Sequence, residues 1–170
     1  VIVGPEVPLC EGLADELSAM GIQTFGPSKE AAMIEGSKVF SKEIMRSAGV
    51  PTALAQYFTS AREAMSYAGQ LGVPLVVKAE GLAAGKGVVI CRTTAEVETA
   101  IKEMIDVHAF GKAGDRILVE EYLEGEEASI LALVDGENVT MLASAQDHKR
   151  VFDGDEGPNT GGMGAYSPAP

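Results

Sequence analysis

The stretch VVKAEGLAAGKGVVI, residues 76–90, joins two apolar runs through a segment rich in glycine and alanine, and it carries two lysines. Glycine lets a backbone approach phosphate oxygens closely because it has no Cβ. A Walker A loop has four residues between its first glycine and the Gly-Lys pair, followed by Ser or Thr. Here three residues separate Gly81 from Gly85, and Gly87 follows Lys86. The dinucleotide fingerprint G-x-G-x-x-G is absent as well, so the stretch predicts a phosphate-binding loop of another kind.

Lys78 interrupts the apolar run PLVVKA, which predicts a strand at Leu75–Ala79. Burial of an unpaired ammonium is costly, so a lysine inside such a strand is expected to meet an anion. That anion is either a ligand phosphate or an internal carboxylate, unless the side chain extends to the surface. The neighbouring loop favours phosphate. With a returning strand at Val88–Cys91, the loop forms a flap whose N–H groups can surround an anion.

The composition indicates a soluble globular protein of one domain or two small ones, with 170 residues, 46% of them hydrophobic, and a mean hydropathy of +0.11. Its net charge of −12 opposes a general affinity for nucleic acid, and no apolar run is long enough to span a membrane. Cys10 and Cys91 lack metal or redox spacing, so we expect both to be small buried residues in a reducing cytosol. The chain starts at VIVGPE without an initiator Met and ends in GAYSPAP, which leads us to expect an internal piece of a longer protein.

The first 27 residues predict a strand–helix–strand crossover of a parallel sheet. The strands are expected at Val1–Val3 and Ile22–Phe25, and apolar residues at helical spacing from Leu9 to Met20 predict the helix between them. Two further helices are expected at residues 28–35 and 37–48.

Two capping boxes predict the starts of later helices, Ser60-x-x-Glu63 for a helix to about residue 71 and Thr93-x-x-Glu96 for one to about residue 107. A strand is expected at Ile117–Glu121, and a hairpin at residues 128–134 and 139–143 around Asp135-Gly136. From residue 146 onward the chain is polar and glycine-rich, which predicts a loop.

The segment VEEYLEGEEAS, residues 119–129, places glutamates on both sides of a turn at Gly125. Its backbone could bind the edge of a purine, with Leu123 against the ring, and a carboxylate beyond the turn could accept both ribose hydroxyls. Taken alone, the same residues also fit an ordinary acidic turn.

Together these features resemble the ATP-grasp superfamily, whose members share a lysine before the first helix, a lysine on the flap strand, a glycine-rich flap and an E-x-x-L hinge followed by a ribose glutamate. The resemblance implies an α/β (α+β) fold in which a small subdomain, at about residues 57–121, is inserted into an ATP-grasp core. Residues 1–27 would end a Rossmann-like N-terminal domain, and residues 28–170 would form an incomplete ATP-grasp domain.

Carried over by position, the resemblance implies roles for individual residues in binding ATP. Lys38 and Lys78 match the two lysines, and Lys78 is the expected catalytic residue. Glu120 would approach the adenine amino group, and Glu127 would bind the ribose, with Glu126 as its nearest rival. The remaining expected contacts are the backbone at the hinge and the flap residues, namely Tyr122, Leu123, Gly81, Gly85, Lys86 and Gly87.

Five segments carry a closer resemblance, to the phosphoribosylamine–glycine ligase family: GPEVPL, FGPSKEAAMIEGSK, KAEGLAAGKGV, EEYLEGEEAS and QDHKRVFDGDEGPNTGGMGAYSPAP. This resemblance implies that ATP phosphorylates the carboxylate of glycine and that the amine of 5-phosphoribosylamine attacks the acyl phosphate. The products would be glycinamide ribonucleotide, ADP and phosphate. It implies small-molecule partners, neither nucleic acid nor a membrane, and a cytoplasmic enzyme of purine biosynthesis.

Three segments are assigned to glycine and phosphoribosylamine. QDHKR clusters cations in an acidic chain, GPNTGGMG suits a loop that approaches a ligand by its backbone, and GPE follows a predicted strand. A solvated strand end and a mobile loop are the alternatives for the first two. The residues assigned are Gly4, Pro5, Glu6, Asp147, His148, Lys149, Arg150, Asn159, Gly161 and Gly162.

One departure from the family concerns the metal. Its magnesium ligands, a Glu and an Asn in a segment resembling E-F-N-x-R-F-G-D-P-E, are missing here, so Mg²⁺ or Mn²⁺ is expected to bind residues further along and none within this chain. The chain alone is therefore expected to be inactive. The alternatives are another ATP-grasp ligase, of the carboxylase or D-alanine ligase type, and a nucleotide-binding module without catalysis.

Overall fold

The structure of the chain is a computed structural model that describes residues 1–81, 87–154 and 156–170. The described residues divide into two compact units, one ending at Tyr122 and the other beginning at Leu123. No helix in these residues is long and apolar enough to cross a membrane.

The first unit begins with four helices, α1 (Glu6–Glu11), α2 (Leu13–Ala19), α3 (Lys29–Gly36) and α4 (Lys38–Ser47). The single helix expected from Leu9 to Met20 was wrong, because Gly12 takes a φ of +105° and separates α1 from α2. This left-handed conformation suits glycine and ends a helix. The strands expected at Val1–Val3 and Ile22–Phe25 are reduced to an isolated parallel bridge between Ile2 and Phe25.

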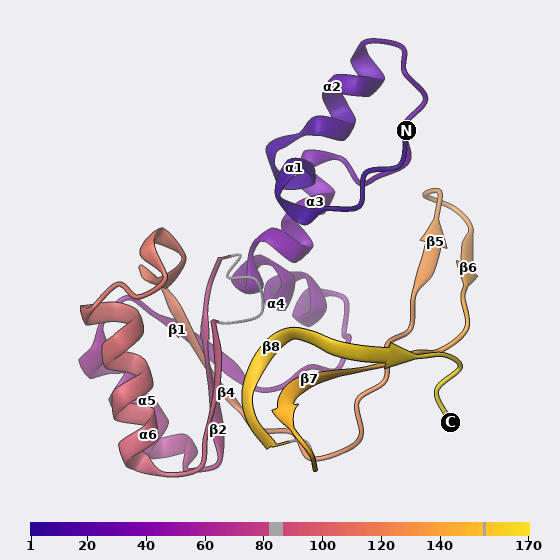
Figure 1. Cartoon of the computed structure of the whole chain (residues 1–170). Helices are drawn as coiled ribbons and strands as arrows, with labels where there is room; N and C mark the ends of the chain where they lie inside the picture. Colours follow the sequence, from indigo (N-terminus) through magenta and orange to yellow (C-terminus); the bar gives the residue numbers. More distant parts are fainter. Residues whose placement is uncertain (82–86, 155) are drawn as a thin grey trace. The chain divides into compact units, whose positions relative to one another are not determined.

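Four antiparallel strands form the sheet of this unit: β1 (Ala55–Phe58), β2 (Leu75–Ala79), β3 (Val88–Cys91) and β4 (Ile117–Glu121). Their order is β1-β4-β2-β3, so β4 lies between β1 and β2 (Figure 1). The sequence predicted the last three strands and missed β1. That strand is only four residues long and lies at the edge of the sheet, where pairing to β4 stabilises it.

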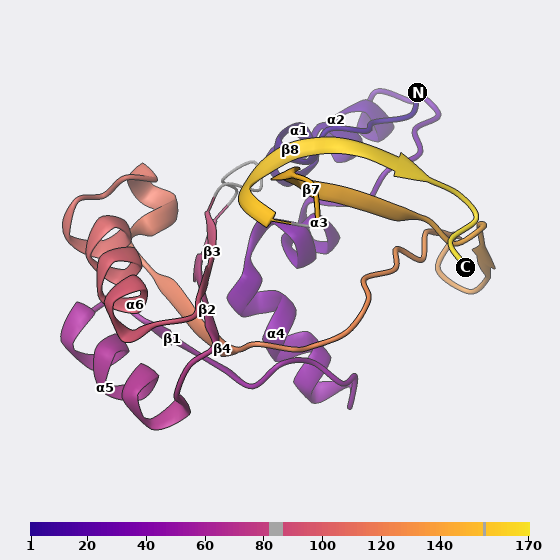
Figure 2. The same ribbon diagram turned by 60° about the horizontal axis from the view of Figure 1, so that its bottom comes forward.

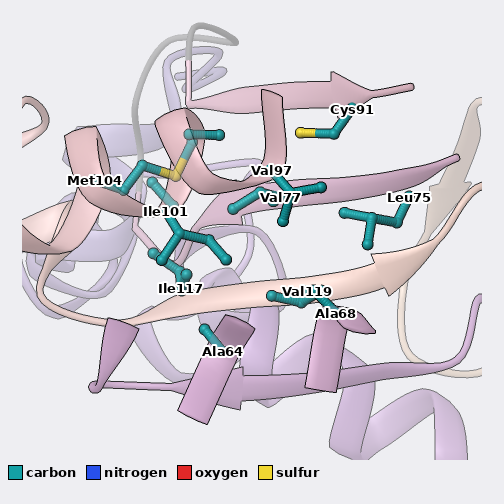
Figure 3. Close-up of a cluster of buried hydrophobic side chains, with 12 residues drawn as sticks. Ala64, Ala68, Leu75, Val77, Cys91, Val97, Ile101, Met104, Ile117 and Val119 are labelled. Carbon is teal, nitrogen blue, oxygen red and sulfur yellow. The ribbon is translucent and has the colours of Figure 1, made fainter. Parts of the chain in front are cut away.

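Helices α5 (Ala61–Leu71) and α6 (Thr94–Ile101) lie beside each other along the sheet (Figure 1). The Thr93 hydroxyl and the Glu96 carboxylate form the predicted capping box, whereas Ser60 only accepts a bond from the Glu63 N–H. The second helix continues as a π-helical turn at Lys102–Asp106, and a 3₁₀ helix follows at Gly111–Gly114. The core between helices and sheet is apolar throughout (Figure 3) and is built from Ala64, Ala68, Leu75, Val77, Ala79, Cys91, Val97, Ala100, Ile101, Met104, Ile117 and Val119.

Strand periodicity explains why only one face of the sheet joins this core. Leu75, Val77 and Ala79 alternate with Val76 and Lys78, so the two sets point to opposite faces. Because the odd-numbered set packs against α5 and α6, Lys78 lies on the other face.

Among the described residues of the second unit, the strands form two hairpins: β5 (Ala132–Val134) with β6 (Val139–Met141), and β7 (Gln146–Phe152) with β8 (Glu156–Tyr166). The strands of the first hairpin are shorter than the predicted ranges of residues 128–134 and 139–143. The loop expected from residue 146 onward was wrong, because that region is a long curved pair of strands (Figure 2). Its register shifts between His148 and Phe152, and glycines in β8 hide the strand from propensity-based prediction.

Candidate functional site

Lys78 and Glu120 meet on the face of the sheet opposite the apolar core. The register pairs Val76 with Glu120 and Lys78 with Leu118, so Lys78 and Glu120 are diagonal neighbours on one face. The Lys78 ammonium forms an ion pair with Glu120 Oε1. The internal-carboxylate alternative for Lys78 is therefore present in the structure, although the lysine side chain remains 27% exposed while that of Glu120 is only 6% exposed.

Lys42 is a second cation on this carboxylate, and the sequence analysis missed it. Its Nζ lies 3.0 Å from Glu120 Oε2 and donates hydrogen bonds to Thr52 Oγ1 at 2.7 Å and to the Ala53 carbonyl at 2.8 Å. A signal was available, because Lys42 follows Lys38 by one helical turn and such residues share a helix face.

Lys38 is the first residue of α4 and binds the start of the glycine-rich segment. Its Nζ donates to the carbonyl of Gly81 at 3.0 Å and to that of Glu80 at 3.4 Å. Partial burial and then the nearby Lys78 ammonium lower the pKa of Lys38, against the opposing effect of Glu80. An anion bound beside these two lysines would relieve that repulsion.

Glu80 is the second buried carboxylate of this region and was also missed, although a strand spacing of two residues from Lys78 predicts the same face. Its Oε1 accepts hydrogen bonds from the Ser37 hydroxyl and from the Val39 N–H at 3.4 Å, which caps α4. Its Oε2 lies 3.4 Å from Arg116 Nε. Glu80 thus connects the end of β2 to the N-terminus of α4.

These contacts leave an excess of positive charge at one end of the sheet. Glu120 is shared by the two lysines Lys42 and Lys78, while the carboxylate of Glu80 is turned toward α4 and Arg116. Lys38 has only backbone carbonyls as its hydrogen-bond partners in the described part of the chain. Such a group of ammoniums can neutralise a polyanion such as a nucleotide phosphate.

The glycine-rich segment is only partly described. Gly81 donates its N–H to the Ala113 carbonyl at 3.4 Å, and the Gly87 carbonyl accepts from Ala79 at 2.8 Å, so both ends of the segment are joined to ordered backbone. The predicted phosphate contacts of Gly85 and Lys86 lie outside the described residues.

The predicted hinge follows β4. The Arg92 guanidinium lies 6.0 Å from the centroid of the Tyr122 ring, and Leu123 is 62% exposed. In the second unit, the exposed Glu127 forms an ion pair with Lys149, with 3.4 Å between Glu127 Oε2 and Lys149 Nζ. Burial alone would lower the pKa of Lys149, but Glu127 and Asp147 together raise it.

The β7–β8 hairpin brings several predicted substrate residues together. Lys149 Nζ lies 3.5 Å from Asp147 Oδ2, and Arg150 on β7 is paired in register with Asn159 on β8. His148 stacks on Tyr166 with ring centroids 5.7 Å apart. Gly162 takes a φ of +125°, and a Cβ on this residue or on Gly161 would meet no atom within 4 Å.

The first predicted substrate segment, Gly4 to Glu6, is exposed at the start of α1. Pro5 is the N-cap residue, and Glu6 is the acidic residue of the first turn, a placement that favours helix formation. Among the described residues, no hydrogen bond or ion pair joins this segment to Lys38 or Lys78.

The described part of the chain has no cluster of metal ligands, and one of its two free cysteines, Cys91, is buried. Within residues 1–81, 87–154 and 156–170, no three His, Cys, Asp or Glu side chains gather where they could hold a metal ion. Burial raises the pKa of the Cys91 thiol to about 11, which keeps it protonated at neutral pH.

Two family models match the chain from end to end. They are "Phosphoribosylglycinamide synthetase, N domain" over residues 1–35 and "Phosphoribosylglycinamide synthetase, ATP-grasp (A) domain" over residues 36–170. Among curated proteins, the phosphoribosylamine–glycine ligase of Yersinia pestis is 56% identical over 169 residues, which are 99% of this chain and 40% of that protein. The chain thus spans about two fifths of the length of the curated relatives it matches.

Solved structures of similar fold include a ligase and a carboxylase domain. The phosphoribosylamine–glycine ligase of Thermotoga maritima has a TM-score of 0.79 and 38% identity, covering 86% of this chain and 38% of that one. A second similar structure is the biotin carboxylase domain of the 2-oxoglutarate carboxylase from Hydrogenobacter thermophilus, solved with MgADP, ADP and bicarbonate. It has a TM-score of 0.68 and 30% identity, and the match covers 88% of this chain and 34% of that one. These similarities confirm the predicted ATP-grasp fold.

Proposed function

Because the chain belongs to the phosphoribosylglycinamide synthetase family, we propose that it supplies ATP-binding residues to a ligase that joins glycine to 5-phosphoribosylamine. The observation that carries this proposal is the match of both family models along the chain, in which the lysines of α4 and β2 lie beside the glycine-rich segment. Residues 1–27 would then end an N-terminal domain, with a subdomain at about 57–121 inside the ATP-grasp domain.

The proposed reaction forms one amide bond at the expense of one phosphoanhydride bond. A carboxylate oxygen of glycine attacks the γ-phosphorus of ATP, and ADP leaves. The amine nitrogen of 5-phosphoribosylamine then attacks the acyl carbon, loses its proton and expels inorganic phosphate. Phosphoryl transfer depends mainly on positioning and charge neutralisation, which lysines and backbone amides provide. The reaction belongs to purine biosynthesis, and we place it in the cytoplasm.

Residue by residue, Lys38 and Lys78 bind phosphate oxygens, and Lys78 is the catalytic residue because its ammonium meets the developing charge. Both carboxylate oxygens of Glu120 already pair with a lysine, so an adenine amino group would have to share one of these oxygens with Lys42 or Lys78. Glu127 remains the proposed ribose acceptor. Gly4–Glu6, the residues Asp147–Arg150 of β7 and the residues Asn159, Gly161 and Gly162 of β8 remain proposed contacts for the other substrates.

Magnesium, when bound, would neutralise charge on the phosphates. No cluster of ligands that fits the ion lies among the described residues, and the groups that we propose to face the phosphates are lysines and backbone amides.

Lys78→Met in the full-length protein tests the proposal, because methionine keeps the aliphatic stem and removes the cation. We expect glycine- and phosphoribosylamine-dependent release of ADP to fall at least ~100-fold, since the transferred phosphoryl group loses a charge partner. Lys102→Met makes the same change at an exposed position and should leave the rate unchanged. Normal turnover in the Lys78 variant would contradict the proposed role.

The same assay separates the alternatives. Turnover of ATP with bicarbonate or D-alanine in place of glycine would indicate another ATP-grasp ligase. Binding of ATP without any turnover would indicate a nucleotide-binding module.

A further inference from the structure

We propose that Lys42 is a positioning residue for ATP, acting through Glu120 on the ammonium of Lys78. Lys42 lies one helical turn after Lys38, and its side chain is 14% exposed. The proposal rests on the proposed function, because it concerns the phosphate contact of Lys78.

Lys42 is held in place from three directions. Thr52 Oγ1 and the Ala53 carbonyl accept two hydrogen bonds from its ammonium, and the third side of the ammonium is turned to Glu120 Oε2. That contact is ionic, since Oε2 has no hydrogen-bond partner within the described residues. The position of the charge on Lys42 is thus determined by the segment that follows α4.

Glu120 transmits this position to Lys78. Its backbone lies in the inner strand β4, paired with Ala55 on one side and Val76 on the other. Within the part of the chain that the structure describes, Glu120 is the sole ion-pair partner of Lys78, and no hydrogen bond anchors that ammonium elsewhere. Hence the carboxylate that orients Lys78 is itself oriented by Lys42.

Lys42 also determines how much positive charge remains for a ligand. One carboxylate shared by two ammoniums leaves a net charge of about +1, whereas without Lys42 the pair of Glu120 and Lys78 would be neutral. Removal of the Lys42 charge should therefore weaken binding of the nucleotide phosphates without affecting the site for glycine.

A purely structural role makes a different prediction. Lys42 bonds to Thr52 and Ala53 and could serve only to attach the connection between α4 and β1. Thr52→Val removes one of these bonds and leaves every charge in place, so it reproduces the structural effect alone.

The experiment compares Lys42→Gln, Lys42→Arg and Thr52→Val in the full-length protein. Affinity for a non-hydrolysable ATP analogue with magnesium is measured by calorimetry, with the KM values for ATP and glycine and the urea midpoint. We expect Lys42→Gln to weaken binding of the analogue at least ~10-fold and to raise the KM for ATP by a similar factor, with the KM for glycine unchanged. Lys42→Arg, which keeps the charge, and Thr52→Val should each stay within about threefold of the unmodified protein.

A double-mutant cycle with Glu120→Gln tests the route through Glu120. We expect Lys42→Gln to cause a smaller loss of ATP affinity in the Glu120→Gln background, because Lys78 is then unpaired with or without Lys42 and only the direct effect of the Lys42 charge is lost. Equal losses in both backgrounds, or equal losses from Lys42→Gln and Thr52→Val, would overturn the inference. If the unmodified protein binds no ATP, the proposed function fails; if it binds ATP and Lys42→Gln binds equally well, only this inference fails.

Discussion

At the scale of the residue, the buried carboxylates explain how lysines are held within an apolar fold. Glu120 lies between Lys42 and Lys78, and Glu80 lies between Arg116 and the N-terminus of α4. A buried carboxylate is stable only when charges or donors surround it. Glu120 therefore holds Lys42 and Lys78 in defined positions, and the Glu80 carboxylate holds the N-terminus of α4, where Lys38 begins the helix.

Replacing Glu80 should show its capping role. Glu80→Ala leaves the Ser37 hydroxyl and the Val39 N–H without their acceptor, which should lower the free energy of unfolding by about 1–3 kcal/mol. Glu43→Ala makes the same change at an exposed position of α4 and should stay within about 0.5 kcal/mol. Urea denaturation of both variants measures the difference, and equal stabilities would show that Glu80 does not support the helix.

At the scale of the element, two glycines differ in whether their surroundings leave room for a side chain. Gly69 lies inside α5, where a Cβ would meet no atom within 4 Å. Gly114 ends the 3₁₀ helix, where a Cβ would lie 2.7 Å from the carbonyl oxygen of Met104. Only the second glycine is required by its surroundings, because a close backbone contact cannot move aside.

Alanine at the two positions should therefore act in opposite directions. We expect Gly69→Ala to raise the free energy of unfolding by about 0.5–1 kcal/mol, since alanine favours a helix interior. Gly114→Ala should lower it by about 1–3 kcal/mol through crowding against Met104. Thermal and urea unfolding measure both, and a neutral Gly114→Ala would mean that the 3₁₀ segment shifts without cost.

At the scale of the whole molecule, the two units differ in burial. The first holds a contiguous core between its sheet and the helices α5 and α6. In the second, no described residue from Leu123 to Pro170 is buried, and its hairpins depend on backbone pairing. Isolated two-stranded hairpins are marginally stable in water, so the units should differ in local stability.

Amide hydrogen exchange of the 170-residue chain should reveal this difference. The slowest amides are expected in β2 and β4, which contribute the fully buried Leu75, Val77, Ile117 and Val119. Amides of β5 and β6 should exchange at least ~100-fold faster, because opening a hairpin exposes little apolar surface. Uniform protection across both units would contradict this order.

The sequence by itself determined the features that depend on neighbouring residues. It located the helices begun by Ser37, Ser60 and Thr93, the strand Ile117–Glu121 and the unusual lysine at position 78, because caps and periodicity act within a few residues. Sequence resemblance also identified the family.

Only the tertiary structure decided what surrounds Lys78. Glu120 lies 42 residues away and reaches it through the register of β2 on β4, while Lys42 joins from a helix that precedes the sheet. The edge strand β1 and the β7–β8 hairpin likewise depend on pairing with a partner strand. Pairing between distant segments depends on the whole core being assembled, so no local pattern could show that two lysines share one buried carboxylate.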